Sequence, residues 1–167
     1  LPGHNCAMNA AQQGATDVAV PQDKVAASLT LLREAVARFG RVVYSSSLGI
    51  EAVVLTDLIY ANDLPIDIFT VDTGRLPEPT LDLIARQGRK YGRSIKVYYP
   101  LAEAVERYVA ANGINGFYDG LEQRQSCCNI RKVEPFNRAV AGYSAWVTGV
   151  RREQSAERAT TQPVEQD

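Results

Sequence analysis

Two adjacent cysteines followed by a basic pair are the most unusual chemical feature of this sequence. Residues 126–132 read SCCNIRK, whereas the third cysteine, Cys6, lies near the start of the chain. Cations stabilise neighbouring thiolates, and an iron–sulfur cluster is held by four cysteine thiolates. Cys127 and Cys128 could therefore be two ligands of a cluster, although two ligands alone cannot hold one. The default alternative is that they are structural, because free cysteine behaves as a small buried apolar residue.

A serine-rich loop, YSSSLGIEA, joins an expected strand to an expected helix. Ser45, Ser46, Ser47 and Gly49 lie where the backbone must turn. Free N–H groups at a helix N-terminus, with hydroxyls beside them, can hold an anion. The loop lacks the GxxxxGK[ST] pattern and contains no lysine, so positive charge must come from elsewhere. The alternative is that the serines only cap the helix that starts near Glu51.

A second loop, TVDTGRLPEPT, follows another expected strand. Asp72, Thr73, Gly74 and Arg75 lie at the carboxyl end of that strand, which is the edge where open α/β sheets bind ligands. Gly74 would let the backbone approach a ring or a ribose closely. Alone, the loop could be an ordinary turn with an exposed arginine. Two such loops at one edge of a sheet favour a nucleotide site.

A third loop, GVRREQSAER, follows the expected strand SAWVTG. Its arginines, Arg151, Arg152 and Arg158, could pair with phosphate or sulfate oxygens in a bidentate manner. If the strand belongs to the same parallel sheet, these arginines supply the charge that the serine-rich loop lacks. The alternative is a solvated basic run.

The elements that must position these loops alternate along the chain. Apolar periodicity predicts helices over 25–39, 51–63, 78–91, 101–113 and about 123–140, and strands over 41–47, 65–72, 94–100 and 144–149. This alternation predicts an α/β fold with a parallel sheet and helices on both faces. Residues 1–20 show no clear period and are expected to form a flexible N-terminal arm, which leaves 21–167 as one α/β domain.

Composition excludes several classes of function. The chain has 167 residues, of which 46% are apolar and 22% charged, and its net charge of −1 gives no basis for general nucleic-acid or membrane-surface binding. No apolar run approaches the roughly 20 residues that span a bilayer. Three cysteines are too few for a disulfide scaffold, which favours a cytoplasmic setting. The chain begins with Leu1 and stops at Asp167 after a polar run, so we expect a fragment.

Four motifs, taken together and in order, carry a family resemblance. SSSLGIEAVVLTDL, IDIFTVDTGRLPEPT, CCNIRKVEPFNRAV and AWVTGVRREQSAERA resemble the assimilatory sulfonucleotide reductases of cysteine biosynthesis. These enzymes reduce adenylyl sulfate (APS) or phosphoadenylyl sulfate (PAPS). The resemblance covers residues 25–167 and implies a Rossmann-like, adenine nucleotide α-hydrolase-like fold. Residues 21–167 would then be a sulfonucleotide-binding domain that lacks its C-terminal segment.

The resemblance also implies roles for the loops. Ser45, Ser46, Ser47 and Gly49 would hold the phosphosulfate, the segment Asp72, Thr73, Gly74, Arg75 and Leu76 would line the adenosine pocket, and Lys132, Arg151, Arg152 and Arg158 would complement the anion. The paired cysteines resemble those of the APS reductases that carry a [4Fe–4S] cluster, whereas PAPS reductases typically lack them. Cys127 and Cys128 would supply two of the four ligands. The cluster would tune the substrate electrostatically rather than carry the electrons.

The implied reaction is the reduction of APS to sulfite and AMP. A cysteine near the C-terminus would attack the substrate sulfur, AMP would leave, and thioredoxin or a glutaredoxin-like dithiol would release sulfite from the S-sulfocysteine. This nucleophile and a CxxC pair are expected beyond Asp167, so this chain alone should bind nucleotide without turnover. A PAPS reductase and a nucleotide-binding α-hydrolase-like domain without redox chemistry remain alternatives, and the resemblance leaves a homo-oligomer open.

Overall fold

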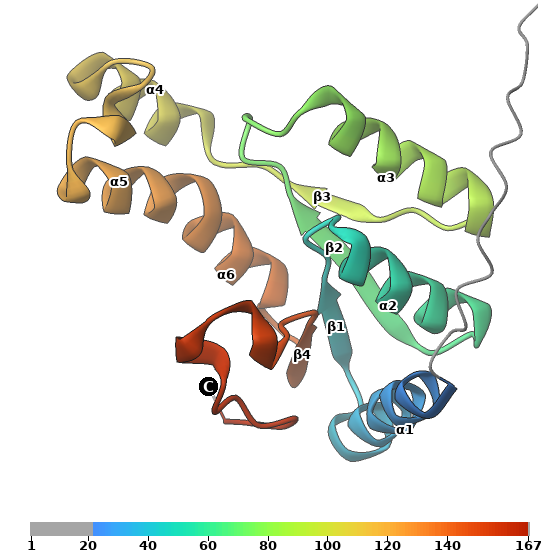
Figure 1. The fold of residues 1–167 in the computed structure, drawn as a ribbon. Helices are drawn as coiled ribbons and strands as arrows, with labels where there is room; N and C mark the ends of the chain where they lie inside the picture. The colour runs from blue at the N-terminus through green and yellow to red at the C-terminus, as the bar shows by residue number, and fades with distance from the viewer. Residues whose placement is uncertain (1–21, 167) are drawn as a thin grey trace, which may run out of the picture.

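The computed structural model describes residues 22–166, except for the side chains of Arg152 and Glu157, and the arm expected at 1–20 lies outside these residues. The helices are α1 (Gln22–Phe39), α2 (Ile50–Ala61), α3 (Glu78–Tyr91), α4 (Ala102–Asn112), α5 (Leu121–Cys128) and α6 (Glu134–Val140). The strands are β1 (Val42–Ser45), β2 (Ile66–Val71), β3 (Lys96–Tyr98) and β4 (Ala145–Thr148) (Figure 1). The expected alternation of strands and helices is therefore confirmed.

The four strands form one parallel sheet in the order β3-β2-β1-β4. Ser45 of β1 lies opposite Phe69 of β2 on one side and opposite Thr148 of β4 on the other. The carboxyl ends of β1, β2 and β4 consequently meet at the same edge. Along the chain, β2 and then β3 are added on one side of β1, whereas β4 is added on the other side. The carboxyl end of β1 is therefore the topological switch point, where α/β sheets bind ligands.

Side chains of β1 and β2 alternate between two apolar layers. Val42 and Tyr44 are buried in the layer that packs against α1, α2 and α3. Val43 and Phe69 are buried in the other layer, which packs against Ala139 of α6. Because successive residues of a strand point to opposite faces, consecutive buried residues such as Val42, Val43 and Tyr44 require cover on both sides of the sheet. Figure 1 shows this arrangement, with the α4–α5 lobe extending beyond the sheet.

The helix expected over 123–140 is interrupted in its middle. α5 ends at Cys128, a π-helical turn spans Asn129–Val133, and α6 begins at Glu134. Pro135 has no N–H to donate to the carbonyl four residues earlier, so the α-helical hydrogen-bond pattern cannot continue through that turn. Widening to a π-turn accommodates the proline, and such turns are frequent at functional sites. In the described part of the chain, no helix is long and apolar enough to cross a membrane.

Candidate functional site

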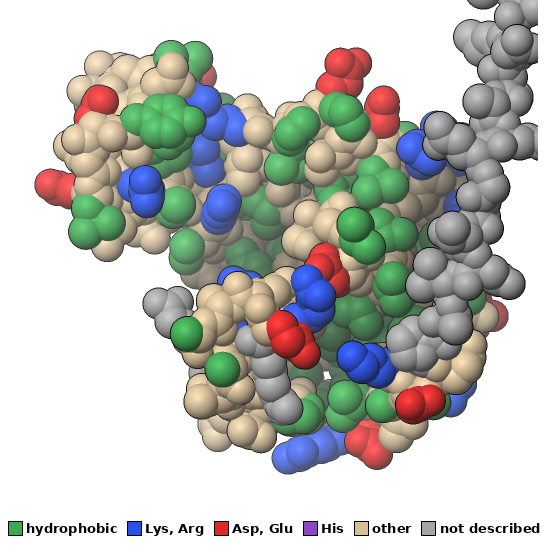
Figure 2. Space-filling model, in the orientation of Figure 1, with side chains coloured by type: hydrophobic (Ala, Val, Ile, Leu, Met, Phe, Trp, Pro, Cys, Tyr) green, Lys and Arg blue, Asp and Glu red, His purple; other side chains and the backbone are tan. Residues whose placement is uncertain are grey.

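A cavity of about 490 Å³ opens at the carboxyl ends of β1 and β2. Its lining residues are Ser45, Ser46, Ser47, Thr70, Val71, Thr73, Leu76, Lys132, Val133 and Phe136. The serine loop (residues 45–49), the DTGRL loop (residues 72–76) and Lys132, which are far apart in sequence, thus meet in one place. In Figure 2, Lys and Arg side chains gather beside a hollow where the α4–α5 lobe meets the rest of the molecule.

The serine loop is held by its own hydroxyls. The buried Ser46 Oγ accepts the N–H of Leu48 at 3.3 Å, and the exposed Ser47 Oγ accepts the N–H of Gly49 at 3.5 Å. Leu48 adopts a left-handed φ of +60°, an uncommon backbone conformation for leucine. Gly49 is the N-cap of α2, and within the described residues no side chain caps it. The serines therefore shape the loop, and the first N–H groups of α2 stay available at its end.

The first half of the DTGRL loop is a compact turn held by two hydrogen bonds. The buried Asp72 carboxylate accepts the N–H of Gly74 at 2.8 Å, and Gly74 has a φ of +71°. The Arg131 guanidinium donates to the carbonyl of Thr73 at 2.7 Å. These contacts turn Thr73 and Leu76 toward the cavity.

Arg75 lies at the side of the DTGRL loop away from the cavity. It donates to the carbonyl of Ile114 and to Asn115 Oδ1, and its guanidinium lies 4.7 Å above the ring of Phe117. Arg75 therefore ties the loop to the connection between α4 and α5. Its expected place in an adenosine pocket stays a prediction.

The segment after the cysteines forms one wall of the cavity. Lys132 and Val133 belong to the π-turn, and Phe136 lies in the first turn of α6. Phe136 packs against Phe69 and Trp146, with ring centroids 5.8 and 5.1 Å away. The wall combines an ammonium group with an aromatic side chain, which suits a ligand that has both an anionic and a ring-shaped part.

The arginines after β4 reach the same edge of the sheet. Arg151 forms an ion pair with Glu51 of α2, with Nη2 and Oε1 2.6 Å apart. Arg158 donates to Gln154 Oε1 within the polar tail. Arg152 lies in a short 3-10 turn (Arg152–Gln154), and its side chain is outside the described residues. Arg151 thus approaches the serine loop without lining the cavity.

The paired cysteines end α5 directly before the π-turn. Cys127 is buried and Cys128 partly so. Tyr108 lies nearby: burial raises its pKa, and the Cys127 thiol adds to the rise. Among the described residues, no group of three or more Cys, His, Asp or Glu side chains could hold a metal ion. The described chain therefore offers two thiol ligands where a cubane cluster needs four.

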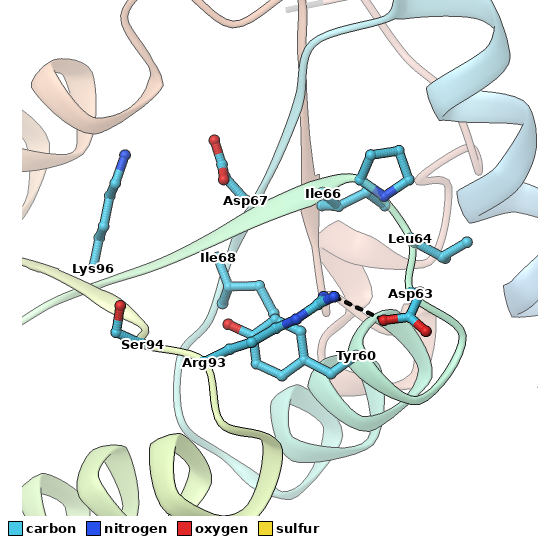
Figure 3. Close-up of a pocket in the computed structure, with 10 residues that line it drawn as sticks. Tyr60, Asp63, Leu64, Ile66, Asp67, Ile68, Arg93, Ser94 and Lys96 are labelled. Atoms are coloured by element: carbon cyan, nitrogen blue, oxygen red, sulfur yellow. Dashed lines mark hydrogen bonds and ion pairs between the residues drawn. The ribbon is translucent and has the colours of Figure 1, made fainter.

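A second cavity, of about 480 Å³, lies at the amino end of β2 (Figure 3). Its Arg93 pairs with Asp63 at 2.8 Å and lies 5.2 Å above the ring of Tyr60. Asp67 accepts a hydrogen bond from Tyr143. Arg93 and Asp63 therefore neutralise each other, and the cavity is at the edge opposite the one where α/β sheets bind ligands. The cavity at the serine loop is therefore the candidate site.

Sequence reasoning missed several residues of the site. Thr70, Val71, Val133 and Phe136 line the cavity. The first two end a predicted strand, so their place at the carboxyl edge could have been inferred. The position of Phe136 in the cavity could not be inferred from helical periodicity, because the π-turn before it changes the direction in which α6 presents its side chains.

The sequence from 41 to 167 matches the family model described as "Phosphoadenosine phosphosulfate reductase domain". The chain belongs to this family. Adenosine 5′-phosphosulfate reductase of Allochromatium vinosum is 50% identical over 134 residues, which cover 80% of this chain and 52% of that protein. The enzyme of the same name from Neisseria meningitidis serogroup B is 53% identical over 116 residues, covering 69% of this chain and 47% of that protein.

The chain spans about half the length of these curated relatives. Among solved structures, the phosphoadenylyl-sulfate (PAPS) reductase of Candida auris, a phosphate complex, matches with a TM-score of 0.63 and 23% identity. The match covers 80% of this chain and 70% of that one. This structural likeness confirms the expected α-hydrolase-like architecture. At 23% identity it supports the fold alone.

Proposed function

We propose that the cavity between the serine loop and the π-turn binds APS. The observation that carries this proposal is that the serine loop, the DTGRL loop and Lys132 line one cavity. Hydroxyls and free N–H groups at the start of α2 suit phosphosulfate oxygens, and the Lys132 ammonium supplies positive charge. The names of these two relatives, both adenosine 5′-phosphosulfate reductases, support the same ligand.

The adenosine would lie against the DTGRL loop and Phe136. Leu76 and Phe136 offer apolar surface to a purine, and the left-handed Gly74 brings the backbone close to the ribose. Asp72 acts by holding this turn through its hydrogen bond to Gly74. Arg151, Arg152 and Arg158 would complement the anion from the β4 side of the site.

The protein that contains this chain would reduce APS to sulfite and AMP, with thioredoxin or a glutaredoxin-like dithiol as reductant, in the cytoplasm. The nucleophilic cysteine would be none of the three in this chain: Cys127 and Cys128 are assigned to metal binding, and Cys6 matches neither role. Residues 21–167 would serve as the sulfonucleotide-binding domain, with 1–20 as an arm.

Cys127 and Cys128 would hold two corners of a [4Fe–4S] cluster. When bound, the cluster would order the site and tune the substrate electrostatically, and the basic residues after the thiols would place positive charge between the cluster and the substrate anion. The chain itself would place a cation between the thiols and the substrate, because Lys132 follows Cys128 by one helical turn and lines the cavity. The π-turn therefore sets the distance between the thiols and the anion.

PAPS is the second candidate substrate, favoured by the description of the matching family and by the name of the solved relative. Its additional 3′-phosphate would need a further basic contact. The lysine and arginines near the serine loop are already assigned to the phosphosulfate. The cysteine pair also favours APS. A nucleotide-binding domain without redox chemistry would bind ATP and neither sulfonucleotide.

Calorimetric titration of this chain with APS, PAPS and ATP tests the proposal. APS should bind, and Lys132→Met should weaken its binding about tenfold or more, since charge-assisted hydrogen bonds contribute about 1.5–3 kcal/mol. Lys96→Met is the matched control, because Lys96 lines the cavity at the opposite edge. Tighter binding of PAPS would favour the second candidate. Binding of ATP alone would remove the reductase assignment.

Sequencing the gene past the codon for Asp167 tests the cluster. A downstream CxxC and a cysteine near the stop codon are expected, and iron in the resulting protein should be lost in Cys127→Ser and retained in Cys6→Ser. A terminal cysteine without the CxxC would leave Cys127 and Cys128 without partners and contradict the cluster.

A further inference from the structure

Glu51 and Arg151 form an ion pair beside the serine loop. Glu51 lies in the first turn of α2, and Arg151 follows β4. The parallel register that sets Ser45 opposite Thr148 brings the chain after β4 alongside the chain after β1. Arg151 reaches α2 for this reason, and its Nη2 lies 2.6 Å from Glu51 Oε1.

The Glu51 carboxylate also faces the serine loop. Its Oε2 lies 3.4 Å from the position that a Cβ on Gly49 would take, and the Ser47 hydroxyl lies 3.5 Å from the same position. Ser47 lines the cavity. The Glu51 carboxylate and the Ser47 hydroxyl, which the proposed ligand anion would contact, therefore both lie beside Gly49.

This carboxylate compensates both sources of positive charge at its end of the cavity. It sits in the first turn of α2, where a negative charge offsets the helix dipole, and it neutralises Arg151. Lys132 is then the only cation among the described residues that line the cavity. An anion at the serine loop meets a weaker field than the basic residues of the sequence suggest.

We infer that Glu51 competes with the ligand anion for Arg151 and so tunes the anion affinity of the site. The inference rests on the proposed anion binding at the serine loop. The side chains of Arg151 and Glu51 are 55% and 35% exposed, and ion pairs at such exposure are weak. A phosphosulfate, which can take a bidentate bond from the guanidinium, is able to displace the carboxylate. A neutral ligand such as adenosine cannot take the place of the carboxylate beside Arg151, so its affinity does not depend on the charge of Glu51.

Titration with inorganic pyrophosphate and with adenosine separates charge from structure. Glu51→Gln keeps the size of the side chain and removes its charge. Pyrophosphate should bind about two- to fivefold tighter to this variant, the range set by the strength of a half-exposed ion pair. Adenosine affinity should not change. Glu34→Gln, at a site on α1, removes an equal charge away from the cavity and should change neither affinity.

Arg151→Gln completes the cycle. In the Glu51→Gln background it should cost more pyrophosphate affinity than in the wild type, because Arg151 is then free to bind the anion. Equal or weaker pyrophosphate binding by Glu51→Gln overturns the competition, as does an equal change in adenosine binding. If wild type and Glu51→Gln both fail to bind pyrophosphate, adenosine and APS, the proposed function falls as well. If APS binds to the wild type and to Glu51→Gln with the same affinity, this inference is overturned and the proposed function stands.

Discussion

The guanidinium of Arg131 donates to the backbone carbonyl of Thr73 at 2.7 Å and so joins two segments 58 residues apart. Arg131 belongs to the π-turn that follows the paired cysteines, and Thr73 belongs to the DTGRL loop. The same guanidinium nitrogen, Nη1, lies 3.3 Å from the position that a Cβ on Gly74 would take. The segment that bears the thiols therefore holds the loop proposed to bind adenosine.

Loss of this contact should weaken nucleotide binding. Arg131→Met removes a charge-assisted hydrogen bond worth about 1.5–3 kcal/mol, and we expect adenosine and APS to bind about tenfold more weakly by calorimetry. Arg131→Lys should recover part of the affinity, since an ammonium can still donate to Thr73. Arg124→Met, at an exposed position of α5, is the control. Unchanged affinity in Arg131→Met would show that the loop holds its shape without this hydrogen bond.

Gly74→Ala should reduce both stability and binding. A left-handed φ of +71° costs an alanine about 1–2 kcal/mol, and the added methyl group would contact Arg131. Gly92 is the matched site, because it is left-handed with a φ of +63° and nothing lies within 4 Å of the position that its Cβ would take. Urea unfolding should show similar losses for Gly74→Ala and Gly92→Ala, whereas only the first should bind adenosine more weakly. Equal adenosine binding by both variants would contradict the role of the turn.

Ser46 and Ser47 should separate stability from binding. Ser46→Ala leaves the N–H of Leu48 without its acceptor in a buried loop, which should cost about 1–3 kcal/mol of unfolding free energy. Ser47 is exposed, so Ser47→Ala should cost less than about 0.5 kcal/mol and should still weaken pyrophosphate binding. Chemical denaturation and calorimetry on the two variants give the comparison. A large stability loss in Ser47→Ala would reverse the assignment.

The hydrogen bond from Tyr143 to Asp67, 2.5 Å long, should make part of the stability depend on alkaline pH. This bond, together with burial, raises the pKa of Tyr143 from 10.0 to about 12. Between these values the unfolded chain loses the tyrosine proton first, so the contribution is full below pH 10.0 and is lost as the pH rises toward about 12.

Tyr143→Phe should therefore be less stable than wild type by about 0.5–1 kcal/mol near neutral pH. The difference should shrink as the pH rises above 10.0. Urea midpoints across this range measure it. Tyr118→Phe, at an exposed tyrosine, should show no such trend. A pH-independent difference for Tyr143→Phe would mean that the hydroxyl acts through packing alone.

Local patterns in the sequence predicted most of the framework. The helix expected over 78–91 has the bounds of α3, with Pro79 in its first turn and Gly92 in a left-handed conformation at its end. Strand and helix periods indicated the parallel α/β class, and the three polar loops lie at the carboxyl edge as expected. These features follow from residue preferences over a few positions, which a sequence displays directly.

Partner choice required the tertiary structure. Arg75 bonds to the α4–α5 connection, Arg151 to Glu51, and Arg131 to Thr73, although all three arginines looked alike in the sequence. The π-turn ahead of Pro135 decides that Lys132 lines the cavity. The sequence by itself determined most of the elements, their order and the family, because these depend on local periodicity and motifs. Which charge meets which depends on distances across the fold, and only strand register and helix packing set those distances.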